Sequence, residues 1–531
     1  MKSFYIILMT KQDISHLFPA GTHTFTEGRI TFFEVHALDI VRVTKDMTAK
    51  KEWVFKLMTA TDERAENGCF KIWYVFGNPK EHRIVVLLSV LRDTLEFPSI
   101  TSHLYEAWNY ERRVHTFFGL TPVGHPDLRP LILHENWPED VFPLRKDFDG
   151  TKRPADAHGI YTFQKVKGEG IYEIPVGPIH AGIIEPGHFR FSVAGESIVS
   201  LEARLGFTHK GSEKLFETLP LESKLKLSEK ISGDSSFSHS LAFCQAVETL
   251  GDMIVPKRAQ MLRVAYAELE RLANHFGDIG AMMMDTGFNF GGAHGARVRE
   301  RVLQMNEKLT GSRFLRGVNV FGGVTTDIID ENKNMLLDFL VDIKKDFSEI
   351  IDVAENSTSL LNRMKETGTI GSHTVTGYGV LGIAGRAIGR SIDTRRDYPY
   401  AGYEEVKLGE IPFETTGDVY ARFHIRIKEA YISMRIIEET LASLPEGSIT
   451  LERSPVSLKK NAVAIGMVEG WRGEIIYFVA TDATGTISRV MPRDPSFVNW
   501  SLLHEAATDN VVPDFPLINK SFNLSYSGND L

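Results

Sequence analysis

The spacing of apolar residues changes along the chain, and this change limits the possible folds more than any other feature of the sequence. Within the first 150 residues, short apolar runs alternate with polar or irregular pieces. Three of these runs predict strands: RITFFEVHAL (29–38), GCFKIWYVFG (68–77) and HRIVVLLSVL (82–91). They are typical of a small α+β domain.

Farther along the chain, the spacing becomes that of a helix. After Pro256, which suits the first turn of a helix, apolar residues recur at a spacing that predicts one buried helix face. The residues of this face are Leu262, Leu269, Leu272, Phe276 and Ile279. A second long helix is predicted within residues 417–447 and ends near Pro445. We therefore expect an α+β protein whose second part is mainly α-helical.

The length of 531 residues requires more than one hydrophobic core. We expect a first domain over residues 1–150, a polar linker over 151–170 and a second domain over 171–531. The second domain should begin with a β-hairpin in GPIHAGIIEPGHFRFSVAGE (177–196), where Pro and Gly mark the turn.

Charge and hydropathy exclude several kinds of partner. A net charge of −9 is mild for this length and gives no reason to expect nucleic acid. The longest apolar run, residues 84–91, is far below the roughly 20 residues that a membrane-spanning helix needs. The start of the sequence lacks the features of a cleaved leader, so we expect a cytoplasmic chain that reaches a membrane only through partners.

The sequence also limits the cofactors that this chain can hold. Its two cysteines, Cys69 and Cys244, exclude a disulfide framework and a thiolate-ligated metal or iron–sulfur site built by this chain alone. No HExxH pair or tight His/Asp/Glu cluster occurs, so no metal is expected. The glycine series from Gly379 to Gly389 does not follow a strand and indicates a turn-rich loop, not a dinucleotide site.

One short stretch, EKISGDSSFSHS (229–240), combines residue types that serve catalysis with those that begin helices. Ser232, Asp234, Ser235 and His239 could supply a triad, but sequence neighbours at a helix start rarely meet in that geometry. We favour a helix N-terminus in which Asp or Ser accepts the free backbone N–H groups.

Two groups of motifs resemble known protein families. YERRVHTFFGLTPVGHPDLRPLILHENWPEDVFPLRKDF (110–148) resembles the 30 kDa subunit of complex I. EPGHFR, GFTHKGSEKL, VPKRAQMLRVAYAELERLANH and DTRRDYPYAGY resemble the 49 kDa subunit and the large subunits of membrane-bound nickel–iron hydrogenases. Their order is that of the fused large subunits of formate hydrogenlyase and hydrogenase-4, which join both domains in one chain.

The resemblance implies where a metal site would lie. In the nickel–iron enzymes, two Cys-x-x-Cys pairs hold the metals, and these positions fall at Ser232 and Ser235 and at Ser525 and Gly528. A serine hydroxyl stays protonated and cannot replace the soft thiolate that this metal pair requires. We expect a vacated metal site without hydrogenase activity. The end of the sequence at Leu531, close behind the second motif, agrees with this expectation because nickel-loaded members are made with a removable tail.

The same resemblance implies a cavity that binds a quinone headgroup in complex I. The histidine of that cavity falls at His188 and its aspartate partner at Asp285, while the tyrosine falls at or next to Gly233. A His–carboxylate pair is a reasonable proton source. Glu185 matches the glutamate by which hydrogenases move protons. A purely structural role for His188 is an equal alternative.

Further charges fall within the matched blocks and are expected to form buried ion pairs, which are unfavourable unless they are well matched. They either transmit a charge change toward a membrane arm or lock helices together. These residues are Arg258, Arg386, Asp393, Arg395, Asp418 and Arg422.

Together, these features predict a peripheral-arm subunit of a complex I-like or hydrogenase-related membrane complex that couples electron transfer to ion translocation. The expected partners are a small iron–sulfur subunit that carries the cluster, a ferredoxin-like subunit and antiporter-like membrane subunits. The expected location is the cytoplasmic side of the inner or plasma membrane. The alternatives are reduction of a quinone in the vacated cavity, as in NADH-quinone oxidoreductase C/D, and a non-redox coupling scaffold.

Overall fold

A computed structural model describes residues 14, 17–18, 22–27, 29–180, 184–371, 373–452 and 456–531. The chain forms two compact units, Met1–Leu128 and Arg129–Leu531. Residues 129–150, which the sequence assigned to the first domain, make their contacts within the second unit. The predicted boundaries at 150 and 170 therefore stay a prediction.

The first unit is built on a five-stranded sheet with the order β1-β2-β5-β4-β3. Its strands are β1 (Thr24–Glu27), β2 (Ile30–Glu34), β3 (Val54–Glu63), β4 (Cys69–Asn78) and β5 (Arg83–Leu91). All neighbours are antiparallel except β2 and β5, which run parallel. The three predicted strands are confirmed as β2, β4 and β5.

Short helices and a small strand pair complete this unit. They are α1 (Ile40–Ala49), α2 (Arg64–Asn67), α3 (Trp108–Phe118) and the parallel pair β6 (Glu96–Pro98) and β7 (Thr121–Val123). The α3 helix ends at Gly119, whose φ of 69° is a left-handed conformation that glycine adopts without strain.

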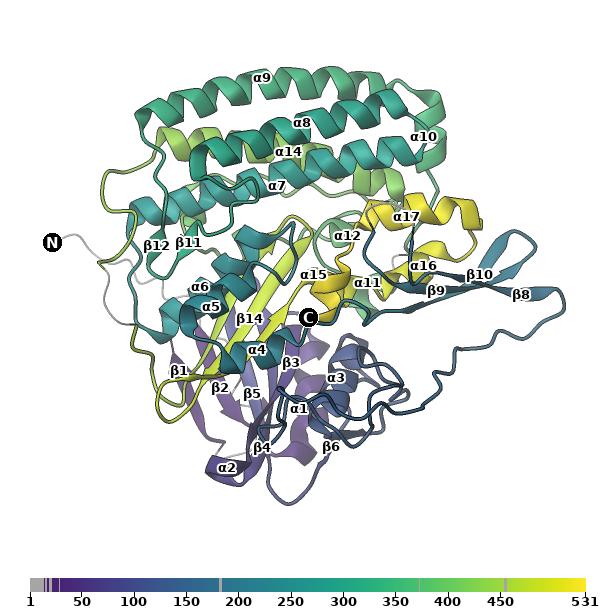
Figure 1. The fold of residues 1–531 in the computed structure, drawn as a ribbon, viewed down its shortest axis with the longest axis vertical. Helices are drawn as coiled ribbons and strands as arrows, with labels where there is room; N and C mark the ends of the chain where they lie inside the picture. The colour runs from purple at the N-terminus through teal and green to yellow at the C-terminus, as the bar shows by residue number, and fades with distance from the viewer. Residues whose placement is uncertain are drawn as a thin grey trace. The chain divides into compact units, whose positions relative to one another are not determined.

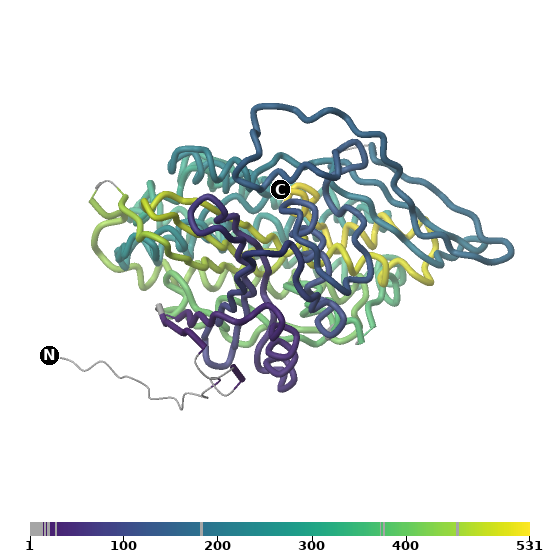
Figure 2. The backbone as a smooth tube through the Cα atoms, turned by 90° about the horizontal axis from the view of Figure 1, so that it is seen from below, coloured from purple at the N-terminus to yellow at the C-terminus, as the bar shows by residue number. Residues whose placement is uncertain are grey.

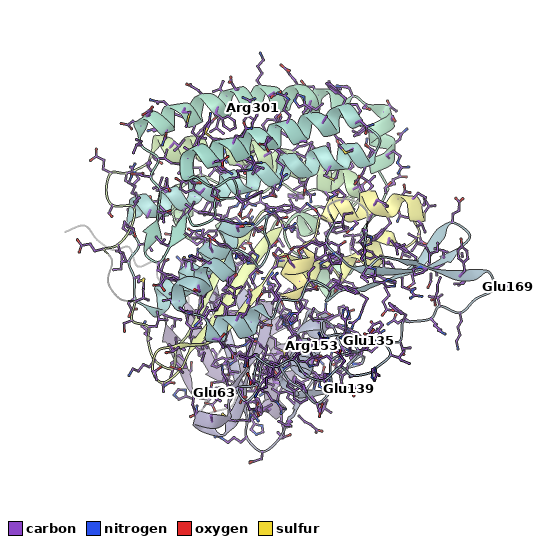
Figure 3. All side chains as sticks on the ribbon, in the orientation of Figure 1. Glu63, Glu135, Glu139, Arg153, Glu169 and Arg301 are labelled. Carbon is purple, nitrogen blue, oxygen red and sulfur yellow. The ribbon has the colours of Figure 1, made fainter. Side chains whose placement is uncertain are left out.

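The second unit contains four long helices that lie side by side in its helical part (Figure 1). They are α7 (Lys257–Asp285), α8 (Asn289–Thr310), α9 (Asp330–Glu355) and α14 (Val419–Ala442). The predicted helix after Pro256 is confirmed as α7, and its five predicted face residues are all at most 1% exposed. Side chains fill the space between the helices, and Arg301 marks the α8 layer in Figure 3.

Close packing between α7 and α8 explains the glycines at their contact. Gly280 of α7 faces Gly295 of α8, where a Cβ on Gly295 would lie 2.5 Å from the Cα of Gly280. The two glycines therefore let the helix backbones approach closely. α14 packs against α7 as well. Among the helices that the structure describes, none is both long and apolar enough to cross a membrane.

Shorter helices surround the long ones. They are α4 (Ser212–Thr218), α5 (Leu221–Ser228), α6 (Ser236–Leu250), α10 (Thr358–Met364), α11 (Thr374–Gly377), α12 (Gly382–Arg386), α13 (Thr394–Asp397), α15 (Pro495–Asn499), α16 (Leu502–Ala507), α17 (Phe515–Phe522) and α18 (Tyr526–Asp530). A two-stranded ribbon of β11 (Asn319–Val320) and β12 (Gly323–Val324) lies beside α7. The mainly α-helical second part is confirmed.

The β-hairpin region at the start of this unit is present, but its strands differ from the predicted ones. β9 (His188–Ala194) pairs with β10 (Ser197–Arg204) and with β8 (Ile171–Val176). The β9–β10 hairpin turns at residues 195–196, whereas the predicted Pro and Gly residues stand in the connection from β8 to β9. Residues 181–183 of that connection lie outside the described residues. Prolines at 178 and 186 cannot donate to a strand ladder. Figure 2 shows this sheet as a blue tongue, and Glu169 labels its tip in Figure 3.

The sequence did not predict the antiparallel meander of β13 (Val463–Gly470), β14 (Gly473–Thr481) and β15 (Ile487–Arg493). α6 packs against β13 and β14. The tight turn between β13 and β14 carries Trp471 and Arg472, and it brings both side chains to residues 232–235.

Before β8, the segment of residues 129–170 has no regular secondary structure and is held by side chains of the second unit. Arg204 of β10 donates to the carbonyls of Pro130 and Leu133 at 2.8 and 3.0 Å. Lys146 pairs with Glu217 at 2.9 Å. The bonds from Arg204 satisfy backbone carbonyls that lack a strand or helix partner.

Candidate functional site

A cavity of about 400 Å³ opens where the two predicted motif segments meet. Its walls come from the loop before β9, the turn before α6, the end of α7, the β13–β14 turn and α17–α18. The lining residues are Ile184, Glu185, Ser232, Gly233, Asp234, Asp285, Arg472, Pro516, Asn519, Lys520, Asn523, Leu524, Ser525, Tyr526 and Ser527.

Serine hydroxyl groups lie at the point where the two motif segments meet. Ser232 Oγ lies 2.9 Å from Ser525 Oγ, although the two residues are 293 positions apart in the sequence. Ser525 Oγ also accepts the backbone N–H of Gly528 at 2.9 Å and so caps α18. Ser235 contacts Asp234 at 3.3 Å. The structure thus brings Ser232, Ser235, Ser525 and Gly528 to one place, and their history as metal positions stays a prediction.

An ion pair lies against these hydroxyls. Arg472 donates two hydrogen bonds of 2.6 Å to the two carboxylate oxygens of Asp234, and Ser232 Oγ donates to the same carboxylate at 2.9 Å. Burial alone would raise the pKa of Asp234, but the Arg472 guanidinium holds this pKa below its usual value. Arg472 also contacts the carbonyl of Asn523. The pair is therefore ionised and fixed on both sides.

The residues present do not fit a nickel–iron centre. A Cβ at Gly528 would lie 2.7 Å from Asp494 Cγ and 3.0 Å from Ser525 Oγ, so no longer ligand can enter at that position. Asp494 is fixed by His239 Nε2 at 3.0 Å and by the N–H of Ser496 at 2.7 Å. The remaining donors are protonated hydroxyls and an aspartate already paired with arginine. Neither cysteine is among the residues that line the cavity.

The stretch 229–240 is a helix N-terminus as predicted, but the predicted cap is wrong. α6 begins at Ser236, and Ser235 makes no side-chain capping bond. Glu270 of α7 accepts the N–H groups of Phe237 and Ser238 at 2.6 and 3.1 Å. Asp234 does not cap α6 because its carboxylate pairs with Arg472. The triad is also absent from this stretch, since His239 contacts Tyr477 and Asp494.

Burial changes the ionisation of two carboxyls near the cavity in opposite directions. Burial raises the pKa of Glu270 to about 7, although the bonds from Ser238 and Phe237 partly offset this effect. For Asp494 burial also opposes ionisation, but the hydrogen bond from His239 holds its pKa at about 2. Glu270 is therefore a group that titrates near neutral pH.

Tyr526 contributes a phenol to the cavity from the second motif segment. Its ring packs on Trp500 with centroids 4.7 Å apart, and its hydroxyl lies near the side chain of Asn519. Burial raises the pKa of Tyr526 to about 12, while a side-chain hydrogen bond with Asn519 acts in the opposite direction. The phenol is therefore protonated at neutral pH.

The three predicted proton-transfer residues are not joined to one another. Glu185 lines the cavity and accepts the N–H groups of Tyr526 and Ser527 at 3.2 and 3.3 Å. Asp285 lines the cavity, and burial raises its pKa while Lys520 lowers it. His188 bonds through Nδ1 to the Gly177 carbonyl at 3.2 Å and has a buried, unpaired Nε2. Among the described residues, no hydrogen bond or ion pair joins His188 to Asp285.

Three of the predicted charges form one buried network between α7, α12–α14 and β13. Arg386 contacts Asp393, Glu429 and Glu469. Arg395 pairs with Asp393 at 2.6 Å and with Glu268 at 2.9 Å. All of these side chains are at most 2% exposed. Arg386 therefore connects carboxylates from three separate elements.

The other predicted charges act separately. Arg258 pairs with Asp327 at 2.8 Å. Asp418 caps α14 by accepting the N–H of Ala421 at 2.8 Å. In the described part of the chain, no carboxylate accepts a hydrogen bond from Arg422; it donates to the Gly417 carbonyl at 2.7 Å, and burial lowers its pKa to about 9. The six charges thus make four kinds of contact: a buried network, a single ion pair, a helix cap and bonds to backbone carbonyls.

Sequence reasoning missed Arg472, Tyr526 and Asp494 as parts of the site. The signal for Tyr526 was present, since it lies between two predicted motif positions. Arg472 and Asp494 reach the cavity region only through the β13–β15 meander, which was not predicted.

Comparisons with known proteins agree with this architecture. Residues 33–154 match the family model described as respiratory-chain NADH dehydrogenase, 30 Kd subunit. Residues 278–466 and 459–530 match that of respiratory-chain NADH dehydrogenase, 49 Kd subunit. The two matches occur in the order of the two domains expected from the sequence.

Whole-chain relatives cover most of the protein. Formate hydrogenlyase subunit 5 of Escherichia coli (strain K12) is 33% identical over 89% of this chain and 84% of its own length. Hydrogenase-4 component G of the same organism is 35% identical over 89% of this chain and 83% of its own length. The C/D subunit of NADH-quinone oxidoreductase from Phocaeicola vulgatus is 30% identical over 75% of this chain and 79% of its own length.

A solved structure is similar as well. A chain of the membrane-bound sulfane sulfur reductase, described as an archaeal respiratory membrane complex, aligns with a TM-score of 0.64 and 26% identity. The alignment covers 68% of this chain and 99% of that chain.

The fold and these matches define a complex I-type oxidoreductase subunit in which a 30 kDa-like domain precedes a 49 kDa-like domain. Within this class, the chain belongs to the family of fused subunits that includes formate hydrogenlyase subunit 5, hydrogenase-4 component G and the C/D subunit of NADH-quinone oxidoreductase.

Proposed function

We propose that this chain is a peripheral-arm subunit of a membrane-bound, complex I-like respiratory complex that couples electron transfer to ion translocation. Its relatives include a formate hydrogenlyase subunit, and its structural neighbour belongs to a respiratory membrane complex. The partners are a small iron–sulfur subunit beside the cavity, a ferredoxin-like subunit and antiporter-like membrane subunits. The chain lies on the cytoplasmic side and binds no metal of its own.

One observation is the reason that the proposed function does not include hydrogenase chemistry. The two motif segments converge at the cavity, yet they present Ser232, Ser525 and the Asp234–Arg472 ion pair in place of thiolates. Asp494 also occupies the space beside Gly528. The chain therefore keeps the architecture of the family, but its side chains at these positions are hydroxyls and an ion pair, not the thiolates that a nickel–iron centre requires.

A second candidate is reduction of a quinone-type acceptor in the cavity, with electrons from the partner's iron–sulfur cluster. The cavity volume of about 400 Å³ and the protonated Tyr526 phenol that lines the cavity favour it. A non-redox coupling scaffold is favoured by a different observation, the buried charge network around Arg386.

Purification from detergent-solubilised membranes through a tag on this chain tests the proposal. We expect co-purification of integral membrane subunits and a small subunit whose cluster gives an electron paramagnetic resonance signal after reduction. A chain found alone in the soluble fraction would contradict the proposal. Membrane partners without any cluster would support the scaffold.

A further inference from the structure

An irregular segment, residues 160–165 (the strap), lies on the polar face of the sheet formed by β8, β9 and β10. His188 and Arg190 alternate along β9 with two buried phenylalanines, so both side chains point to this face. The ring of Phe163 lies 5.3 Å from the His188 ring, and the guanidinium carbon of Arg190 lies 4.4 Å from the centre of the Phe163 ring. The strap therefore covers both side chains.

One carboxylate fixes the strap on the sheet. Glu202 of β10 accepts the Tyr161 hydroxyl and the Gln164 backbone N–H, each at 2.7 Å. Arg129 pairs with the same carboxylate at 2.8 Å and donates to the Thr162 carbonyl at 2.9 Å. Hydrogen bonds to an ionised group are stronger than those between neutral groups. Glu202 is therefore the latch of the strap.

The strap is otherwise weakly held. In the part of the chain that the structure describes, Gln164 is the one strap residue whose backbone N–H makes a hydrogen bond. Ile160 at the start of the strap is 90% exposed, and Lys165 at its end is exposed as well. Segments with few backbone bonds and few buried contacts open at a small free energy compared with global unfolding. The strap can therefore leave the sheet while the strands stay paired.

Beneath the strap, His188 is kept from water with one ring nitrogen unused. Its Nδ1 donates to the Gly177 carbonyl at 3.2 Å, so Nε2 of the neutral ring is an acceptor. This Nε2 is buried and has no hydrogen-bond partner among the described residues, and the same is true of Arg190 Nε. Unpaired buried polar atoms oppose the closed arrangement, because water binds them once the strap leaves. The latch and the unpaired atoms thus act in opposite directions.

We propose that the strap is a releasable cover that controls the access of water to His188. While Glu202 holds the strap, His188 Nε2 does not exchange protons with solvent. When the strap leaves, water binds Nε2. His188 is a residue for which the sequence predicts proton transfer, so the cover decides when this residue can act. The cover uses only contacts within the second unit and does not depend on the proposed redox function.

The test measures how often the strap is open in the intact complex. Diethyl pyrocarbonate acylates an accessible, unprotonated imidazole nitrogen, and mass spectrometry follows its reaction with His188. Glu202→Gln weakens the latch, and Tyr161→Phe removes one bond from it but leaves the carboxylate in place. Tyr172→Phe is the matched control, because the Tyr172 hydroxyl donates to the Gly195 carbonyl at 2.8 Å on the same sheet.

We expect acylation of His188 to be about tenfold faster in Glu202→Gln and about fivefold faster in Tyr161→Phe, because charged and single hydrogen bonds of the latch are lost. Tyr172→Phe should leave the rate unchanged. Hydrogen exchange of the Gln164 amide should accelerate in the same two latch variants.

Unchanged rates in both latch variants would overturn the proposed cover. Equal acceleration at His180, whose Nε2 bonds the Gly187 carbonyl at 2.8 Å, would overturn it as well, because the whole sheet would then have loosened. Neither result touches the membership in a membrane complex, which co-purification and the cluster signal decide.

Discussion

Asp234 and Arg472 are the residues that separate this cavity most clearly from a thiolate metal site. Their bidentate pairing is the strongest hydrogen-bond geometry that arginine and a carboxylate can form. Because the arginine is 4% exposed, its charge depends on Asp234 for compensation.

Removal of this arginine should destabilise the second unit. In Arg472→Met, the carboxylate of Asp234 loses its cation, and we expect the free energy of unfolding to fall by about 3 kcal/mol, the low end for a buried pair. The low end applies because the Asp234 side chain keeps 33% exposure. The double variant Asp234→Asn/Arg472→Met should recover most of the loss. Denaturant titration measures both, and an equal loss in the double variant would contradict the ion-pair explanation.

Gly528 tests whether the fourth metal position is closed. Gly528→Ala should destabilise the protein by about 1–3 kcal/mol because the new methyl group meets the fixed Asp494 side chain. Gly377→Ala is the matched control, since its Cβ would meet nothing within 4 Å. Thermal unfolding of the two variants is compared. A neutral Gly528→Ala variant would show that the position still accepts a side chain.

The Glu270 side chain connects helix α7 to the first turn of helix α6. Its carboxyl binds the first-turn N–H groups of α6 and has a folded pKa of about 7, against an ordinary value of 4.5. The folded state therefore holds a proton that the unfolded chain releases at lower pH. This contribution to stability is fully present below pH 4.5 and is lost as the pH rises to about 7.

The expected loss over this pH interval is about 3 kcal/mol. In Glu270→Gln, which cannot titrate, stability should be lower at pH 5 and the decline between pH 5 and 7 should become shallower. Unfolding midpoints at several pH values measure the difference. If both proteins show the same slope, Glu270 is not the titrating group.

The elements α7, α12, α13, α14 and β13 are joined by the network around Arg386. A lysine at this position carries the same charge but cannot contact Asp393, Glu429 and Glu469 together. Arg386→Lys should therefore lower the free energy of unfolding by about 3 kcal/mol. The surface variant Lys257→Arg serves as the control, because its pair with Glu405 is largely exposed. Equal stability of both variants would argue against a locking role.

At the scale of the whole molecule, the sequence predicted the order of the two parts and the long helices because their apolar period is regular. It missed β13–β15 because these strands are buried on both faces and lack the alternation that marks a strand. Consequently, Arg472 and Asp494 could not be placed. The family resemblance predicted that Ser232 and Ser525 share one site. The cap of α6, however, comes from Glu270, and no local pattern connects residues so distant in sequence.

We propose that this subunit keeps the family fold without a nickel–iron centre. The most direct test is metal analysis of the intact complex, purified through this chain, together with electron paramagnetic resonance during reductive titration. We expect iron from partner clusters and nickel far below one atom per chain. Stoichiometric nickel bound to this subunit would contradict it.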